Sequence, residues 1–416
     1  MRRGPPRARQ LVAYTAFVAL AACILAACGG GSGRSGARAQ RRLPPGPVLD
    51  PCVSPRVKAG AAPDPSVLGA GADSDGDGVS DACEQSLAEK YAPVVYHSSV
   101  EKFILANVDW YLARSEIWFF DDACLPDLHK WFIYHPSQTE IARQRFTGGC
   151  GSTDTVYSWG TRSQKKERTF YLENVGGEDS YGTGLTSMWT TYFHAYLNVN
   201  GGVTVQYWRF YPGHGGGLTG QTYSGDWEGV MIVLDRQLQP QTLGFIWRGD
   251  LNWKRPSEVE WEGSHFRVYS EPNEHGSSAT ASGLDSQNCQ GDGVTMDPTN
   301  PCTVTRQQTW TGGLVYSCSK YDERWCNYKG RTGLPGGALL NVGEKTATMN
   351  GQDFVRYSGL WGEPVAGTGS FTDGWWGPAF FGTQMTSAGF VTAWCTGMQR
   401  DAATLTKECY PTATSR

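Results

Sequence analysis

Apolar and polar residues alternate along residues 203–211, and this alternation predicts a β-strand. The odd-numbered residues, Arg209 among them, would share one face, and the even-numbered residues would share the other. Residues 230–234 are apolar throughout, which is typical of a strand buried on both faces. Between these runs lies a glycine-rich stretch that ends in Gly-Asp-Trp-Glu at residues 225–228. We expect two neighbouring strands joined by a glycine-rich turn, with Asp226 and Glu228 together at the mouth of the second strand.

Strand-like runs with turn residues between them recur along the chain, at residues 94–97, 131–135, 168–172, 191–199, 243–248, 266–269, 314–317, 338–342 and 354–357. Residues 271–312 are rich in small and polar residues and predict a loop excursion stapled by cysteines. Aromatic residues make up 12% of the chain, charged residues make up 18%, and there are 53 glycines, which favours a tightly turning β protein. The prediction is a mainly β fold, an antiparallel β-sandwich with long disulfide-stapled loops over residues 89–416.

The N-terminus resembles a bacterial lipoprotein signal. Four arginines precede an apolar run that is too short for a membrane span and ends in Leu-Ala-Ala-Cys at Cys28. The same pattern ends earlier at Cys23, but it leaves a shorter apolar run. Residues 1–28 therefore predict a signal and lipobox with lipidation at Cys28, and residues 29–66 predict a disordered spacer. The expected location is the cell envelope, where the protein would be held on the membrane by its lipid; a plain cleavable signal is the alternative.

The net charge of the chain indicates which partners to expect. Loss of residues 1–27 would remove four arginines and no acidic residue, which moves the net charge from −4 to −8. No basic stripe offsets this charge, so we expect no nucleic acid partner.

Ten cysteines follow Cys28, an even number that predicts disulfides in an exported chain. Pairing of nearest neighbours would join Cys52 to Cys83 first.

An acidic loop with a short helix is expected over residues 67–88. Oxygen ligands stand at alternate positions along the loop, and glycines permit its turn, as a hard cation with six to eight ligands requires. The stretch resembles a thrombospondin type 3 calcium repeat, including its Asp-Ala-Cys-Glu ending. The resemblance implies Asp73, Asp75, Asp77 and Asp81 as calcium ligands, and Glu84 is a further expected ligand. A helix would follow over residues 82–91 with Asp81 as its N-cap; a solvated acidic turn without an ion is the alternative.

The carboxylates of Asp226 and Glu228 are the second candidate site. Two carboxylates on one face of a strand share a proton or share a cation, here an unspecified divalent cation. His214 and several glycines lie nearby in the sequence, so the backbone could fold closely around an ion or a ligand. The alternative is an acidic pair on an edge strand that faces solvent.

Several short motifs follow one another along residues 89–382. They are Tyr-Ala-Pro-Val-Val-Tyr at 91–96, Val-Asp-Trp-Tyr-Leu at 108–112, Tyr-Trp-Arg-Phe-Tyr-Pro at 207–212, Gly-Asp-Trp-Glu at 225–228, Tyr-Ser-Gly-Leu-Trp-Gly at 357–362 and Gly-Pro-Ala at 377–379. These motifs and their order resemble those of the vacuolar protein sorting-associated protein 62 family.

The Gly-Asp-Trp-Glu motif is also similar to the His-Asp-Trp-Glu motif of the necrosis- and ethylene-inducing toxins. This resemblance implies a β-sandwich that holds a divalent cation through Asp226 and Glu228 and binds a sphingolipid headgroup. Tyr223 stands where both families usually have a histidine, and His214 stands where the toxins have an aspartate. His275 lies near a histidine-containing segment of the first family and is a further candidate neighbour.

Three functions remain open at this point. The first is a lipid-anchored surface protein that binds a glycan or lipid headgroup through a cation at Asp226 and Glu228. The second is an extracellular hydrolase in which His214 acts as general base. The third is a structural envelope lipoprotein. Trp361, Trp375 and Trp376 would serve either as a platform for sugars or as core residues.

Overall fold

The structure is a computed structural model that describes residues 52, 68–69, 71–98, 101, 103–121, 128–144, 168–174, 181–183, 185–198, 201–215, 222–247, 250–271, 273–280, 303–308, 314–319, 338–344, 347–363 and 377–378. The chain divides into two compact units, 1–48 and 49–416, and every described residue belongs to the second. The predicted signal, the lipidated Cys28 and almost all of the predicted spacer lie outside the described residues. No helix among the described residues is long and apolar enough to cross a membrane.

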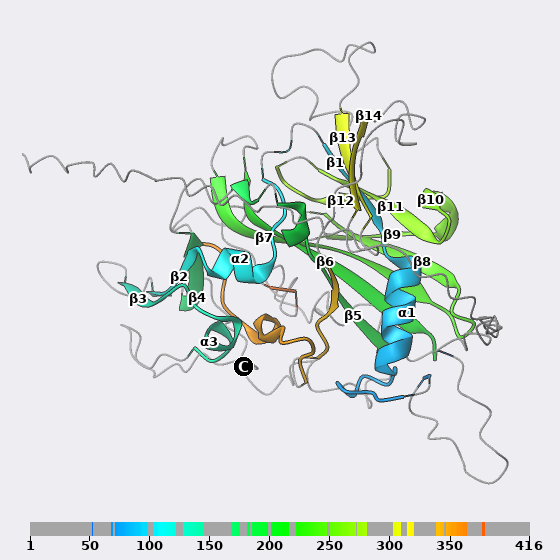
Figure 1. Cartoon of the computed structure of the whole chain (residues 1–416), viewed down its shortest axis with the longest axis horizontal. Helices are drawn as coiled ribbons and strands as arrows, with labels where there is room; N and C mark the ends of the chain where they lie inside the picture. Colours follow the sequence, from blue (N-terminus) through cyan, green and yellow to red (C-terminus); the bar gives the residue numbers. More distant parts are fainter. Residues whose placement is uncertain are drawn as a thin grey trace, which may run out of the picture. The chain divides into compact units, whose positions relative to one another are not determined.

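A six-stranded sheet forms the centre of this unit (Figure 1). Its strand order is β15 (Leu339–Asn341), β5 (Thr191–Leu197), β6 (Val203–Gly215), β7 (Thr222–Leu234), β8 (Pro240–Trp247) and β9 (Asp250–Lys254). All neighbours are antiparallel except β15 and β5, which run parallel. The longest strands are β6 and β7, which pair from Thr204 opposite Val233 to Gly215 opposite Thr222.

Two further sheets complete the β structure. One follows the order β10 (Trp261–Glu262), β11 (His265–Ser270), β1 (Val94–Ser98), β13 (Thr303–Gln308) and β14 (Leu314–Ser319), with β12 (Ser277–Ser278) paired to β11. The other has three strands in the order β3 (Leu128–Tyr134), β2 (Ser115–Asp121) and β4 (Arg168–Asn174). The pair β1 and β11 is parallel, and the remaining pairs are antiparallel. The mainly β, antiparallel prediction is confirmed.

Two cores lie on opposite faces of the central sheet. Val205 and Ile232 belong to a core shared with β1, β11 and helix α1 (Asp81–Tyr91). Trp208 and Trp227 belong to an aromatic core shared with β2, β4 and the segment that ends at Trp361. The alternation predicted for residues 203–211 and the double-sided burial predicted for residues 230–234 are therefore both present.

The short helices flank the sheets: α2 (Val108–Leu112), α3 (Gln138–Ala142) and the 3₁₀ turns η2 (Thr186–Met188), η3 (Pro256–Glu258) and η4 (Asp353–Arg356). The last turn corrects the strand predicted at 354–357. Phe354 and Val355 are both buried there, so their apolar character reflects packing rather than an extended backbone. Strands β2, β9, β10, β12 and β13 were not predicted, and β12 and β13 lie inside the stretch expected to be a loop.

The predicted helix after the acidic loop is present as α1, with one correction. Its N-cap is Ser80, and the carboxylate of Asp81 accepts hydrogen bonds from Ser74 instead of capping the helix. The disulfide between Cys52 and Cys83 is present, and Cys83 lies on the buried face of α1. The other proposed cysteine pairs lie outside the residues whose side chains are described.

Gly225 fixes the backbone just before Asp226. Its φ is +66°, which L-residues with a side chain rarely adopt, and a Cβ at this position would collide with the carbonyl oxygen of Trp361. The aromatic core therefore approaches β7 closely where the acidic pair begins. Trp361 is itself fully buried, which removes it as a sugar platform, while Trp375 and Trp376 lie outside the described residues.

We predict that Gly225→Ala lowers the free energy of unfolding by more than about 2 kcal/mol, because the variant adds a steric clash to the unfavourable φ. Gly263→Ala is a matched control, since Gly263 has a φ of +65° and nothing within 4 Å of its Cβ position. That control should lose only about 1 kcal/mol. Equal losses in denaturant titrations would show that the contact with Trp361 does not constrain β7.

Candidate functional site

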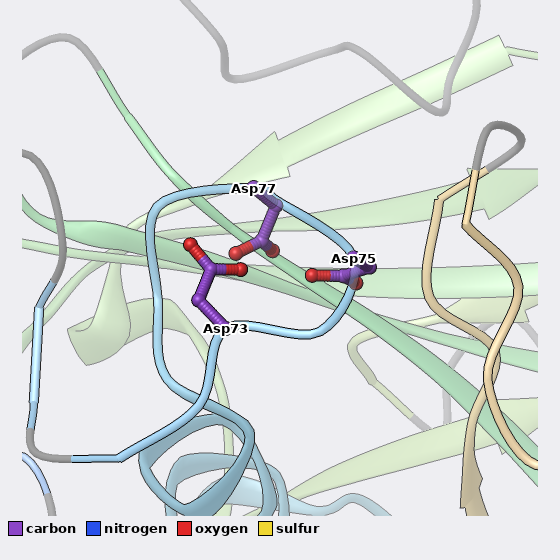
Figure 2. A group of neighbouring side chains, drawn as sticks. All are labelled: Asp73, Asp75 and Asp77. Carbon is purple, nitrogen blue, oxygen red and sulfur yellow. The ribbon is translucent and has the colours of Figure 1, made fainter.

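The acidic loop gathers three carboxylates around one point. Asp73, Asp75 and Asp77 bring one oxygen each within 4.8 Å of one another, and their side chains point into the loop (Figure 2). Gly76 and Gly78 lie between and after them with positive φ, which lets the backbone turn around the carboxylates. The amides of both glycines donate to the carboxylate of Asp73 at 2.8 and 3.1 Å. This cluster can hold a metal ion.

Asp75, Asp77 and the nearby Glu84 are buried, and their carboxylate oxygens are only partly satisfied. Both carboxylate oxygens of Asp75 are buried without a hydrogen-bond partner, as are one oxygen of Asp77 and one oxygen of Glu84. Burial, together with repulsion among these acids, raises the pKa of Asp75 to about 7, that of Asp77 to about 11 and that of Glu84 to about 8. Buried acceptors of this kind need either protons or a cation.

Glu84 extends the cluster from the first turn of α1. Its carboxylate is fully buried and lies against that of Asp77, and its second oxygen accepts a hydrogen bond from Asn341 at 2.9 Å. Asp81 differs from the other predicted ligands, because both of its oxygens are engaged by Ser74 at 2.8 and 2.6 Å. The structure therefore brings together Asp73, Asp75, Asp77 and Glu84, while Asp81 braces the loop.

The second candidate site lies on the face of β7 that looks toward β11 and β12. Asp226 pairs across the strands with Tyr211 of β6, and Glu228 pairs with Arg209. Both acids are almost fully buried, at 2% and 4% exposure. They therefore lie inside the strand pair rather than at the mouth of a strand, and the alternative of a solvent-facing acidic pair is wrong.

His275 joins Asp226 directly. Its Nδ1 lies 2.7 Å from a carboxylate oxygen of Asp226, and its Nε2 lies 3.1 Å from the carbonyl oxygen of Phe103 and 3.4 Å from a carboxylate oxygen of Glu101. Its ring stacks on that of Tyr211 at a centroid distance of 3.7 Å. Burial alone would lower the pKa of His275, but the carboxylates of Glu101 and Asp226 raise it to about 9. The two carboxylates therefore favour the protonated form of the His275 ring.

The backbone around His275 is strained. His275 has a φ of +56° and Asn273 a φ of +62°, both in the left-handed region. Hydrogen bonds hold this turn in place: the amide of His275 donates to the carbonyl of Glu271, and the amide of Asn273 donates to the carboxylate of Glu101. Strain of this kind is frequent at binding and catalytic sites.

The environment of Glu228 disfavours the ionised form of its carboxylate. Burial raises its pKa well above the usual value, repulsion from Asp226 adds to this, and attraction to Arg209 opposes it. One of its carboxylate oxygens is buried without a hydrogen-bond partner. Arg209 is fully buried and donates to Ser277 at 2.7 Å and to the hydroxyl of Tyr211 at 3.3 Å. Glu228 therefore has an acceptor to offer to an ion or a ligand.

His214 and Tyr223 face each other across the end of the β6 and β7 pair. His214 is buried, and burial lowers its pKa, while the charge of Asp226 opposes this shift. The side chain of Tyr223 lies outside the described residues. His214 thus belongs with Asp226, Glu228 and His275, and Tyr223 is placed by its backbone alone.

Arg209, Glu101 and Glu271 belong to this cluster but were not predicted. Arg209 carried a signal, because it is a charged residue on a strand face that is otherwise apolar or aromatic. Glu101 and Glu271 carried none, since they lie far along the chain from Asp226 and join the cluster through His275 and its turn. Among the described residues, the acidic loop is the one group whose three or more ligand atoms lie within 4.8 Å, so Asp226 and Glu228 have no third such ligand at that distance.

Comparisons with known proteins add little to this geometry. No family model matches the chain, and no curated protein matches it. One similar structure is necrosis and ethylene inducing protein 2 from the causal agent of cocoa's witches' broom disease, with 13% identity and a TM-score of 0.23 over 47% of this chain and 67% of that chain. Another is NLPPya in complex with mannosamine, with 20% identity and a TM-score of 0.20 over 23% of this chain and 45% of that chain. At these TM-scores neither likeness says what this chain does.

We predict that removing metal ions with a chelator lowers the melting temperature, because an ion bound only by the folded protein stabilises it by about 2.7 kcal/mol at 100 times its Kd. Asp75→Asn should abolish this response, and it should raise the stability of the metal-free protein by removing a buried, repelled charge. Glu89→Gln, on the exposed side of α1, should respond like the wild type. Identical melting curves of the wild type with and without chelator would show that no metal ion in the loop stabilises the protein.

Proposed function

We propose that this protein is a binding protein that recognises a glycan or lipid headgroup through a divalent cation held by Asp226 and Glu228. One observation carries the proposal: Arg209, Asp226, Glu228, His214 and His275 are buried together between two sheets. Burying several ionisable groups costs stability, and such clusters with shifted pKa values are concentrated at functional sites.

Two side chains of the cluster, Asp226 and Glu228, offer the oxygen ligands that a hard cation prefers. Glu228 offers a buried oxygen that has no hydrogen-bond partner, and Asp226 lies on the same face of β7. His275 holds Asp226 in orientation through its Nδ1, and it would release its proton when a cation takes over the charge. A bound divalent cation would supply open coordination positions for hydroxyl oxygens of the ligand.

We further propose that the ion of the acidic loop is calcium. Every candidate ligand atom there is a carboxylate oxygen, and hard oxygen ligands are those that calcium takes. Its role would be structural, because α1 and Glu84 tie the loop to Asn341 and to the core beside β5.

The hydrolase and the structural lipoprotein remain the alternatives. One feature favours hydrolysis: His214 is buried near Asp226, and burial lowers its pKa, which favours the unprotonated form that a general base needs. A structural role would leave the buried cluster without a ligand, and the stability cost of the cluster would then be unexplained.

We predict that an array of glycans and lipids finds a ligand whose binding is lost in chelator. Asp226→Asn combined with Glu228→Gln should abolish that binding, because the amides keep the shape of the side chains and lose the charge. Asp75→Asn should leave this binding intact, because the variant should fold without the ion of the acidic loop. The two metal sites can therefore be tested independently.

Two other outcomes oppose the proposal. If the double variant loses about 1–3 kcal/mol of stability while ligand and metal affinity are unchanged, the carboxylates serve the fold. Release of a cleaved product from the bound glycan, lost in His214→Ala, would instead favour the hydrolase.

We also propose that the lipid is attached at Cys28. Cys28→Ser should move the protein from the membrane fraction to the soluble fraction, because a single thioether-linked lipid group would be its anchor. Cys23→Ser is the matched control and should stay with the membrane. Retention of the Cys28→Ser variant on membranes contradicts the assignment, and loss of the Cys23→Ser variant would place the lipid on the earlier cysteine.

A further inference from the structure

Strand β9 forms one edge of the central sheet, and the side of it that faces away from β8 is open. It pairs with β8, and no other described strand pairs with it. The opposite end of the sheet is different: the part of β5 that lies beyond β15 is covered by the acidic loop, where the amide of Leu197 donates to the carbonyl of Asp77 at 3.4 Å. An uncovered edge can accept a further strand.

The register with β8 decides which backbone groups of β9 face the open side. Asp250 pairs with Trp247, and two residues connect them along the chain. Pairs in an antiparallel ladder alternate between bonded and non-bonded, and the pair that closes a two-residue connection is a bonded one. The even-numbered residues of β9 therefore bond toward β8, whereas Leu251 and Trp253 direct their amides and carbonyls to the open side.

A large apolar side chain lies next to this open side. Trp253 is 42% exposed, and Asn252 is exposed as well. Leu251 and Trp253 lie on the same face, over Gly244 of β8, where a Cβ would come within 2.9 and 3.2 Å of them. Leu251 packs in part against the aromatic core, but Trp253 leaves much of its ring in water. Tryptophan is enriched among the residues that carry most of the binding energy of protein interfaces.

A second copy of β9 complements the first when the two strands run antiparallel about a twofold axis at Asn252. Leu251 then lies opposite Trp253 of the second copy, so the residues with outward backbone groups meet and can exchange both of their hydrogen bonds. The same pairs set an aliphatic side chain beside an aromatic one. At the ends, position 250, an aspartate, lies opposite Lys254 of the second copy, which pairs opposite charges.

The neighbouring registers lack this match. An axis at Leu251 would set Trp253 opposite the glycine at position 249, and an axis at Trp253 would set Leu251 opposite Arg255. Both registers lose the pairing of Leu251 with Trp253, and neither brings the aspartate at position 250 opposite a lysine. Strand β9 is therefore complementary to itself in one register.

We propose that two copies of this chain associate through β9, so that their central sheets join into one continuous sheet. The occupant of the edge is a second copy because the strand matches itself in its backbone groups, its apolar residues and its charges. A pairing of five residues buries less than the roughly 1,200 Å² of a stable interface, so the dimer should dissociate on dilution. The contact uses no residue of either candidate cation site.

Cross-linking tests the register directly. At the twofold axis Asn252 would face its own copy in a non-bonded pair, whose Cα atoms lie about 4.5 Å apart, within the range that a disulfide spans. Asn252→Cys in the full chain should therefore form a covalent dimer with a mild oxidant, and a reductant should reverse it. Ser257→Cys is the matched control, because Ser257 is exposed but lies beyond the paired strand. This control should give no more dimer than the wild type.

Sedimentation over a range of concentrations tests the side-chain contacts. The wild type should pass from monomer to dimer, and Trp253→Ala should raise the dissociation constant about tenfold or more. Trp131→Ala is the matched control, because Trp131 is 50% exposed on β3 and its replacement should leave the dimer unchanged. Lys254→Asp should weaken the dimer roughly two- to fivefold by setting two acidic residues opposite each other, and adding Asp250→Lys in the same chain should restore it.

Three outcomes would overturn the proposal. A monomer at every concentration, with no dimer from Asn252→Cys, would exclude the association. Equal cross-linking of Asn252→Cys and Ser257→Cys would indicate random collision instead of a defined register. A cross-linked product that contains another protein would assign the edge to a different partner. Because Asn252 and Trp253 are exposed, their variants should melt within a few degrees of the wild type, so that loss of the dimer is not loss of the fold.

Discussion

Carboxylates buried inside a β-sheet protein are the constraint on which both candidate sites depend. A carboxylate that leaves water loses its solvation, and it must recover that free energy from donors, from positive charge or from a proton. Among the described residues, the acidic loop has few donors and no basic side chain bound to its buried oxygens, so it could hold a metal ion. The Asp226 cluster contains Arg209 and His275, so it can exist with or without an ion.

The arrangement of sheets explains why these acids are buried where they are. The inner face of β6 and β7 is apolar along most of its length, and it becomes charged only toward the end that carries Arg209 and Asp226. At that end the aromatic core on the opposite face approaches most closely, through Trp361 and Gly225. The packing of Trp227 on one face thus holds Asp226 and Glu228 toward the other face.

Much of this architecture could be predicted from the sequence, because period and composition are local signals. The alternation in residues 203–211 predicted β6 and its two faces, and the spacing of the aspartates predicted the loop and the start of α1. The residues that complete the second site could not be predicted in the same way. Glu101 joins the cluster through His275, and Glu271 joins it through the turn that carries His275, so both depend on tertiary folding. The apolar residues of η4 resemble a strand in the sequence, although they are buried in a 3₁₀ turn.

The central claim is that a divalent cation binds at Asp226 and Glu228 in addition to the one in the acidic loop. Crystals grown with manganese, which replaces calcium and magnesium and scatters anomalously, would test it most directly. We predict two peaks in the anomalous difference map, one among Asp73, Asp75, Asp77 and Glu84 and a second between Asp226 and Glu228. A single peak in the loop, with His275 still bonded to Asp226 and Arg209 beside Glu228, would contradict the claim.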